Sequence, residues 1–309
     1  MSKSIDPNLA ELYGGLSNIE LSVEQFDFGH GISLSKTYAH FMAPYLLAFA
    51  QAAPGKSHPP PWKAAGGGIA YDITAEIFIP REFSPPSFFN RVNTVWLLTA
   101  LLRLITAPLI FAPVLSSQSI KSIAGSKEEP YFWPMEVHTK RLVPCPPFDN
   151  VNYLTWIRNN WEAAGWLMCK NNGFYLAFRA FDQSTFNTEP ALALVSLWGA
   201  LETLFSPSQV ELKFRTSSMI AAFLEQPGNQ RLEDYRHIQK LYDSRSKAAH
   251  GSGHDQGEAY KETFIVLRRA LIKIIEANHL PNKKDLEALL FGGNITHSGE
   301  KQKSFDASK

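Results

Sequence analysis

Along the first half of the chain, the apolar positions follow the period of two that is expected of β-strands. Apolar residues recur at alternate positions over residues 69–79, which predicts a strand with one face buried. Residues 19–28 and 32–38 are rich in β-branched and aromatic side chains and are separated by a short glycine-containing turn, which predicts a hairpin. Residues 53–68 combine several prolines with three consecutive glycines and therefore predict a flexible loop.

The second half changes to the spacing of amphipathic helices, in which apolar residues recur every three or four positions. In the stretch 190–205, for example, Leu194, Leu197, Trp198 and Leu201 lie on one face of a helix. Prolines and glycines separate such stretches, so the connections are short and we expect a compact helical bundle. Five helices are predicted, over residues 152–171, 190–205, 210–225, 231–249 and 258–278.

A proline-rich stretch that ends near Asn150 separates the two patterns and predicts a domain boundary. We therefore expect an α+β protein, with a strand-rich mixed α/β domain at residues 1–148 and a helical bundle at residues 149–293. The polar residues 294–309 predict a disordered tail. Because residues 1–148 carry no recognisable catalytic motif, we interpret them as a sensor or regulatory domain.

One apolar segment, Val95–Leu115, is long enough to cross a bilayer. Arg103 lies near its middle, where a charge is costly in a membrane, and Pro108 and Pro113 interrupt its second half. The favoured interpretation is a buried helix up to about Ile105 followed by a buried strand. A membrane span is the alternative.

Composition narrows the class of protein. The chain has 309 residues, of which 45% are hydrophobic and 19% charged, and its formal net charge is +1. This balance is typical of a globular protein and gives no overall field that would attract nucleic acid or an acidic membrane. The two cysteines have no metal-site spacing, and the first residues lack a signal-peptide core. We therefore expect a cytoplasmic protein without a metal or other cofactor.

The end of the predicted helix 231–249 carries the candidate chemistry. Arg245 precedes His250 by five residues, and Gly251 follows as a helix-ending signal. Five residues correspond to about 140° of rotation on a straight helix, so the two side chains share a direction only if the helix ends between them. The alternative is structural: Arg245 forms a surface ion pair and His250 caps the helix.

An arginine and a histidine suit the cleavage of RNA without a metal ion. The reaction needs a base for the ribose 2′-hydroxyl, an acid for the leaving oxygen and a cation for the phosphate. Histidine titrates near neutrality, and the planar arginine side chain binds phosphate oxygens while keeping its charge. One pair is a small set for this task, whereas two pairs brought together in a symmetric dimer supply every group.

Three segments in order, LWGALETLF (197–205), ELKFRTSSMIAAFLE (211–225) and IQKLYDSRSKAAHG (238–251), resemble the HEPN family, in particular its ApeA-like branch. The resemblance covers residues 151–291. It implies a helical bundle that forms a homodimer through the face that carries the motif. Many such domains are metal-independent ribonucleases of toxin, abortive-infection or antiviral systems.

The family signature is an arginine, four to six residues and a histidine, often followed by glycine, and Arg245 and His250 match it. The resemblance implies that His250 acts as acid or base and that Arg245 binds the scissile phosphate of an RNA substrate. Ser246 departs from the Asn, Asp or His that active members often carry after the arginine. A non-catalytic HEPN module for dimerisation or for binding RNA or protein is therefore the alternative. A protein or nucleotide activator is a further expected partner.

Neighbouring residues are supporting candidates. Glu202, Asp243 and Ser246 are candidates for orienting the pair, although Glu202 is equally suited to a buried ion pair with Arg215. His250 with His254 and Asp255 would make an incomplete metal site on a glycine-rich stretch, so we expect no metal there.

Two further groups of residues offer nucleic-acid contacts, and for both the structural interpretation is favoured. The tryptophans at 156, 161, 166 and 198 have helical spacing and are expected mostly in the core rather than stacked on bases. The last helix has a basic side made of Lys261, Arg268, Arg269 and Lys273, which is expected to be a solvated face.

Overall fold

The computed structural model describes residues 6–7, 11–85, 89–106, 109–136, 152–206, 212–250 and 256–294. The chain divides into two compact units that interleave along the sequence. The first comprises residues 1–83 and 110–137, and the second comprises residues 84–109 and 138–309. The sequence predicted consecutive domains instead, and both the boundary near Asn150 and the tail at 295–309 lie outside the described residues.

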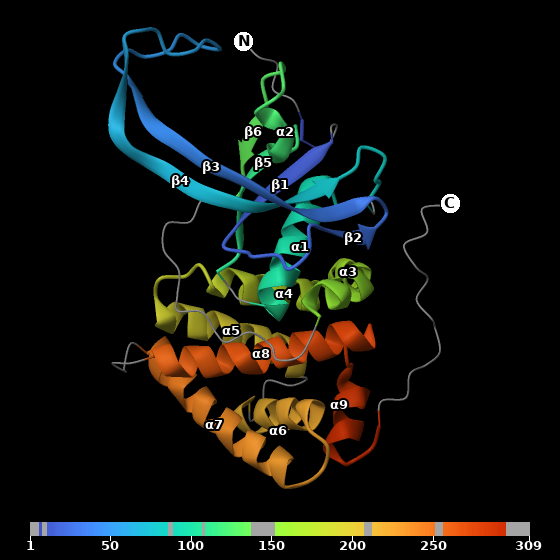
Figure 1. Cartoon of the computed structure of the whole chain (residues 1–309). Coiled ribbons are helices and arrows are strands. Elements are labelled where there is room, and N and C mark those ends of the chain that lie inside the picture. The colour runs from blue at the N-terminus through green and yellow to red at the C-terminus, as the bar shows by residue number, and fades with distance from the viewer. Residues whose placement is uncertain are drawn as a thin grey trace. The chain divides into compact units, whose positions relative to one another are not determined.

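The first unit is a six-stranded antiparallel half-barrel sheet with the strand order β2-β3-β4-β1-β5-β6 (Figure 1). The predicted hairpin is confirmed, because β2 pairs with β3 through Asp27 and Ser33. A one-turn helix, α2 (Ile120–Ile123), follows β5. The strands are β1 (Leu12–Ser17), β2 (Gln25–Gly29), β3 (Ile32–Ala48), β4 (Trp62–Ile79), β5 (Phe111–Ser116) and β6 (Phe132–Pro134).

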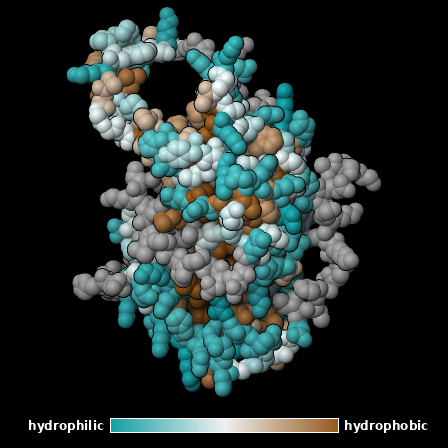
Figure 2. All heavy atoms as spheres, in the orientation of Figure 1, coloured by the Kyte–Doolittle hydropathy of each residue, from teal (hydrophilic) through white to brown (hydrophobic). Residues whose placement is uncertain are grey.

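Residues 39–48 of β3 and 62–73 of β4 form a long two-stranded arm, in which the two strands pair only with each other among the described residues. Large apolar side chains of this arm are exposed, including Tyr45, Leu46 and Trp62 at 59%, 63% and 55%. Figure 1 shows the course of the two strands, and Figure 2 shows hydrophobic residues on the surface of the arm. The arm belongs to the first unit, and its base is anchored by Phe41, Tyr71 and the buried Ile73, which pack in a core cluster with Val114 and Ile120. The rest of the arm is a two-stranded ribbon, which gains little stability from burial.

The arm corrects the prediction of a flexible loop at 53–68, because residues 62–68 are part of β4. The register between the strands shifts where Pro44 faces Gly68 and Tyr45 faces Ala65, so the triple glycine forms an irregularity within the ribbon. Gly68 has a φ of +131°, and a Cβ there would collide with the carbonyl oxygen of Ala43. The glycines therefore permit close strand pairing rather than a mobile loop.

The second unit is helical and contains α1 as well as the helices of the C-terminal half (Figure 1). All five predicted helices are confirmed, and periodicity missed α4 and the short α9. The helices are α1 (Arg91–Ile105), α3 (Tyr153–Lys170), α4 (Asn172–Ser184), α5 (Pro190–Phe205), α6 (Leu212–Leu224), α7 (Asn229–Ala249), α8 (Gly257–Ala277) and α9 (Lys283–Leu290). The expected α+β class is therefore correct.

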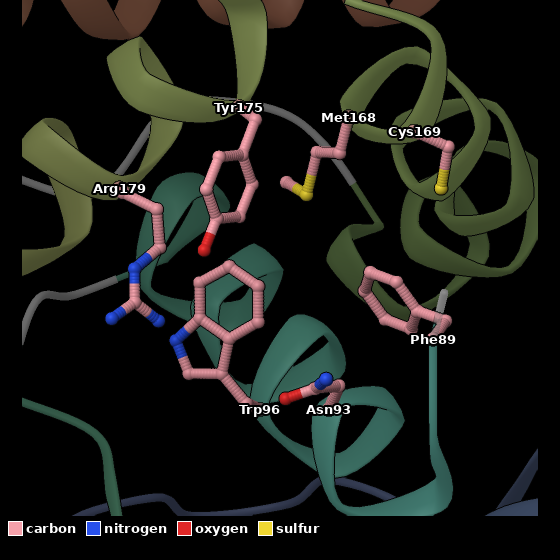
Figure 3. A pocket seen from close by; sticks show the side chains of 7 residues that line it. All are labelled: Phe89, Asn93, Trp96, Met168, Cys169, Tyr175 and Arg179. Carbon is pink, nitrogen blue, oxygen red and sulfur yellow. The ribbon is translucent and has the colours of Figure 1, made fainter. Parts of the chain in front are cut away.

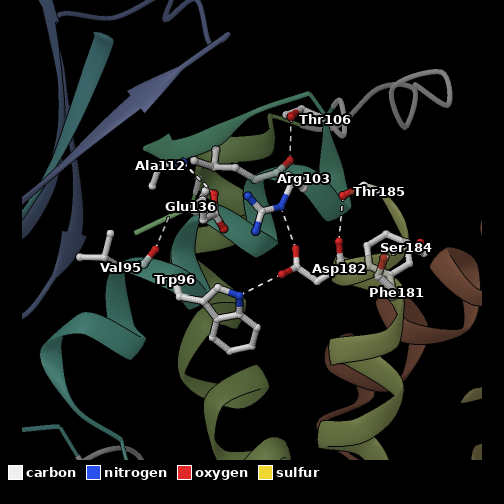
Figure 4. Close-up of polar contacts among 12 residues, drawn as sticks. Val95, Trp96, Arg103, Thr106, Ala112, Glu136, Phe181, Asp182, Ser184 and Thr185 are labelled. Atoms are coloured by element: carbon white, nitrogen blue, oxygen red, sulfur yellow. Dashed lines mark hydrogen bonds and ion pairs between the residues drawn. The ribbon is translucent and has the colours of Figure 1, made fainter. Parts of the chain in front are cut away.

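Buried polar contacts explain why α1 belongs to the helical unit. Arg103 of α1 forms an ion pair of 2.7 Å with Asp182 of α4, and both side chains are 0% exposed (Figure 4). Trp96 donates a hydrogen bond of 2.9 Å from Nε1 to the other oxygen of Asp182. From α8, Arg268 donates to the carbonyl oxygens of Leu104 and Ile105 at the end of α1. These bonds satisfy carbonyl groups that the helix end leaves unpaired.

The apolar segment around Arg103 resolves as predicted, into helix α1 up to Ile105 and strand β5 from Phe111. Arg103 is balanced by a carboxylate in a protein core, where an unpaired charge is costly. No helix within the described residues is long and apolar enough to span a membrane.

Candidate functional site

Helix α7 carries Arg245 and His250 and is unusually polar. Only Ile238 and Leu241 of its 21 residues are buried. Tyr242 and Arg245 follow Ile238 by four and seven residues and therefore lie on the same face of the helix. This spacing directs both side chains towards α5, whereas most of α7 presents polar side chains to solvent.

Arg245 forms an ion pair with Glu202 of α5. The Nη2 atom of Arg245 lies 3.5 Å from Oε1 of Glu202, and the two side chains are 28% and 20% exposed. Neither Nε of Arg245 nor Oε1 of Glu202 has a hydrogen-bond partner within the described chain, although both atoms are buried. The ion pair is therefore loose, since a well-formed arginine–carboxylate pair makes two short hydrogen bonds.

Two aromatic residues complete the surroundings of Arg245. Its guanidinium lies 5.6 Å from the ring centre of Tyr242, and the Tyr242 ring meets the buried Trp198 ring edge to face at 5.0 Å. Burial and the negative charge of Glu202 raise the pKa of Tyr242, while Arg245 opposes the shift. The tyrosine therefore stays protonated at neutral pH and can donate a hydrogen bond from the site.

His250 is exposed at the end of α7, where its backbone N–H bonds to the carbonyl of Ser246 at 3.3 Å. Its ring forms no hydrogen bond or ion pair with the part of the chain that the structure describes, and no contact joins it to Arg245. One chain thus holds Arg245 against α5 and leaves His250 in solvent. Gly251, which was expected to end the helix, lies outside the described residues.

The supporting candidates divide into one that contacts the arginine and two that do not. Of the two roles expected for Glu202, the structure shows the contact with Arg245 and no ion pair with Arg215 among the described residues. The helical periodicity of the sequence allows either Arg215 or Arg245 as the partner of Glu202. The packing of α7 on α5 selects Arg245. Asp243 is bound to Lys213 of α6 at 2.7 Å, and the Ser246 side chain contacts neither Arg245 nor His250 among the described residues.

An open groove of about 740 Å³ lies between α6 and α7. Phe214 is 54% exposed and packs edge to face with Tyr235 at 6.1 Å. Tyr242 forms the part of the wall that is in contact with Arg245. Sequence reasoning missed Lys213 and Phe214, because an exposed aromatic residue beside a lysine has no periodic signal. The groove is lined by Leu212, Lys213, Phe214, Gln239 and Tyr242.

The basic side predicted for α8 is a solvated face only in part. Arg268 is 4% exposed and binds backbone carbonyls, while Arg269 forms ion pairs with Glu225 and Asp234. Lys273 donates to the carbonyl of Phe223. Lys261, paired with Glu258 at 3.2 Å, and the exposed Lys273 keep the predicted surface character. The two arginines join helices rather than meet solvent alone.

The predicted core role of the tryptophans is confirmed for three of them. Trp161 and Trp198 are 2% and 0% exposed, and Trp156 is buried and bonds through Nε1 to Glu276 at 2.8 Å. Trp166 is partly exposed and lies under the ammonium of Lys170.

A metal site was not expected, and part of the relevant sequence is not described. The described ranges contain no cluster of three His, Cys, Asp or Glu side chains suited to a metal ion. His254 and Asp255 lie outside those ranges.

Searches for related proteins return nothing: no family model, no curated protein and no solved structure matches the chain. The site is therefore interpreted from its own geometry.

Proposed function

We propose that the α7 region is the site of a metal-independent endoribonuclease that acts as a homodimer, in keeping with the resemblance to HEPN domains. The observation that carries the proposal is the position of Arg245. It is a half-buried cation, loosely paired with Glu202, and it contacts Tyr242, which lines an open groove together with Lys213 and Phe214. A guanidinium, an ammonium and an aromatic face are the groups that bind the phosphates and bases of single-stranded RNA.

The loose ion pair is suited to exchange with a phosphate. Glu202 holds the guanidinium of Arg245 near the groove without saturating its donors. A phosphate oxygen that approached Arg245 would offer the short charge-assisted hydrogen bonds that Glu202 does not make. Lys213 would add a second cation on release from the exposed Asp243.

The reaction is an internal transesterification. A base removes the proton of the ribose 2′-hydroxyl, the 2′-oxygen forms a bond to phosphorus, and the bond from phosphorus to the 5′-oxygen breaks. The departing 5′-oxygen receives a proton from an acid, which leaves a 2′,3′-cyclic phosphate and a 5′-hydroxyl. His250, exposed at the end of α7, is the residue proposed for proton transfer.

Two chains are required by this proposal. One chain supplies one exposed histidine at the end of α7, whereas the reaction needs both a base and an acid. A symmetric dimer that brings two α7 ends together provides two copies of His250 and two of Arg245. The polar character of α7, with only Ile238 and Leu241 buried, is compatible with a solvated cleft between the copies.

A non-catalytic RNA-binding or dimerisation module is the second candidate. It is favoured by one specific observation, that Arg245 contacts Glu202 and Tyr242 while His250 points into solvent without a described partner. In this alternative, Arg245 fixes α7 on α5 and the groove binds RNA without cleaving it.

A cleavage assay in EDTA separates the two candidates. We would incubate the protein with single-stranded RNA, with DNA of the same sequence and with 2′-O-methyl RNA, and determine product ends by mass spectrometry. Cleavage of RNA alone, with cyclic-phosphate ends, is the expected result. Arg245→Ala and His250→Ala should each lower the rate at least about a hundredfold.

Matched controls lie on the same helix. Arg236 is an exposed arginine, and His237 is a half-exposed histidine 3.7 Å from Glu262, so Arg236→Ala and His237→Ala change the same residue types away from the site. Both should cleave RNA at the wild-type rate. RNA binding without cleavage, equally weakened by Arg245→Ala and by Phe214→Ala, would establish the non-catalytic module instead.

The first unit is proposed to regulate the second. This part of the proposal needs an experiment that keeps α1, because removal of all residues before 150 would leave Asp182 buried without Arg103. Shortening the arm, by replacing residues 43–69 with a two-residue turn, keeps Phe41 and the Met42–Ala70 pair and leaves α1 in place. A changed cleavage rate or RNA affinity is expected, and unchanged values in both would contradict a regulatory role.

A further inference from the structure

A second pocket lies within the helical unit and shares no lining residue with the groove beside α7. It has a volume of about 250 Å³ and is formed by residues from α1, α3, α4 and the segment that precedes α1 (Figure 3). The residues that line it are Phe89, Asn93, Trp96, Met168, Cys169, Tyr175 and Arg179.

Arg179 gives this pocket a positive charge. Its guanidinium stacks over the Trp96 ring, with 4.8 Å between the carbon centre and the ring centroid. Among the described residues, no carboxylate pairs with Arg179 and no acidic side chain lines the pocket. The nearby Asp182 is already bound through one oxygen to Trp96 and through the other to Arg103. The guanidinium therefore retains donors for a ligand.

The Trp96 wall is rigid, and polar groups stand beside it. The hydrogen bond of 2.9 Å to Asp182 and an edge-to-face contact with Phe178 fix the indole ring. The amide of Asn93 and the hydroxyl of Tyr175 have no hydrogen-bond partner among the described residues. The pocket therefore combines apolar walls with a few polar groups, as small-molecule sites do.

Apart from Trp96, the apolar side chains of the pocket lie away from the guanidinium of Arg179. In Figure 3, Arg179 and Tyr175 lie at one side, and Phe89 and Cys169 lie at the opposite side with Met168 above. Burial raises the pKa of the Cys169 thiol to about 11, so this side chain is neutral and adds no negative charge at neutral pH. The arrangement matches a ligand with an apolar ring at one end and an anionic group at the other.

We propose that this pocket binds a small planar carboxylate, with its ring against Phe89 and Trp96 and its two oxygens on the guanidinium of Arg179. The volume is below the roughly 300–1,000 Å³ of pockets for drug-sized ligands, which limits the ligand to about one aromatic ring system. A carboxylate is favoured over a phosphate because Arg179 is the one cationic side chain among the described residues that line the pocket, and it balances a single negative charge.

Calorimetric titration of the full chain with benzoate tests the proposal, with benzamide, cyclohexanecarboxylate and inorganic phosphate as comparisons. Benzoate should bind with a Kd of about 1 mM or lower. Benzamide should bind at least about tenfold more weakly, because it lacks the charge that pairs with Arg179. Cyclohexanecarboxylate should be weaker because its ring is not planar, and phosphate should not compete.

Variants locate the site. Arg179→Gln should weaken benzoate binding at least about tenfold, and Asn93→Ala, on the exposed first turn of α1, should weaken it a few-fold. Arg236→Gln on α7 removes the same charge outside the pocket and should bind as the wild type does. If Arg179→Gln does not fold, Arg179→Lys keeps the charge, loses the planar fork and should bind more weakly than wild type.

The contrary results are equally specific. No binding of benzoate at about 10 mM, equal binding of benzoate and benzamide, or unchanged binding by Arg179→Gln would each overturn the proposal. Phosphate that competes as well as benzoate would show a general anion site and would also overturn it. RNA cleavage plays no part in these readouts, so the two proposals stand or fail separately.

Discussion

The helical unit contains two arginine–carboxylate pairs that differ in almost every property. Arg103 and Asp182 are fully buried, 2.7 Å apart, and supported by Trp96. Arg245 and Glu202 are partly exposed, 3.5 Å apart, and each leaves a buried polar atom without a hydrogen bond among the described residues. The first pair has the geometry of a structural element, and the second is loose enough for the anion exchange that we propose.

Breaking the buried pair should have the largest effect. Arg103→Ala should lower the free energy of unfolding by about 3–5 kcal/mol, because Asp182 is left as an uncompensated buried charge. Urea denaturation followed by circular dichroism measures this. The double variant Arg103→Met with Asp182→Leu should be more stable than Arg103→Ala. A loss below about 1 kcal/mol for Arg103→Ala would show that the pair is not buried as described.

The contact between α8 and the end of α1 should rank next. Arg268→Met keeps much of the side-chain volume but removes the donors to the carbonyls of Leu104 and Ile105. The expected loss is about 1.5–3 kcal/mol, the range for hydrogen bonds to a charged group. Lys261→Met on the same helix changes a surface ion pair and should cost less than about 1 kcal/mol. Equal losses in the two variants would contradict the buried role of Arg268.

Breaking the loose pair should change function more than stability. Glu202→Gln should alter the free energy of unfolding by less than about 1 kcal/mol, since the pair is partly exposed and poorly bonded. The same variant should bind single-stranded RNA more tightly, because Arg245 loses its competing carboxylate. Fluorescence anisotropy with a labelled RNA measures this, with Glu233→Gln on α7 as the control. Weaker RNA binding by Glu202→Gln would contradict the proposed exchange.

The smallest effect is expected at Tyr242, in alkaline solution. Its pKa is raised above the ordinary value of about 10 by burial and by Glu202, so the protonated form stabilises the fold. This contribution is fully present below about pH 10 and is lost as the pH rises through the raised pKa. As the pH is raised above 9, the free energy of unfolding should therefore fall more for wild type than for Tyr242→Phe. Parallel stability curves for the two proteins would contradict the shift.

The sequence predicts regular elements well where burial repeats along the chain. The helices at 190–205 and 231–249 and the break between α1 and β5 follow from apolar periodicity and proline positions. The triple glycine was misread as a loop, because glycine permits both a loop and a close strand pairing, and only the partner strand decides.

Contacts between residues that lie far apart in the chain could not be predicted from one sequence. The ion pair of Arg103 with a residue 79 positions later places α1 in the helical unit, and no local pattern records it. The candidate site shows the same limit: the sequence proposes Arg245 and His250, but the contact of Arg245 with Glu202 depends on helix packing. Lys213 and Phe214 entered the site only through the groove that they line.

The most direct test of the proposed site is the mass of RNA product ends formed in EDTA by wild type, His250→Ala and the control His237→Ala. We predict 2′,3′-cyclic phosphate and 5′-hydroxyl ends from wild type and from His237→Ala, and no such products from His250→Ala. The same ends at the same rate from His250→Ala, or products with 5′-phosphates, would contradict cleavage by the α7 site.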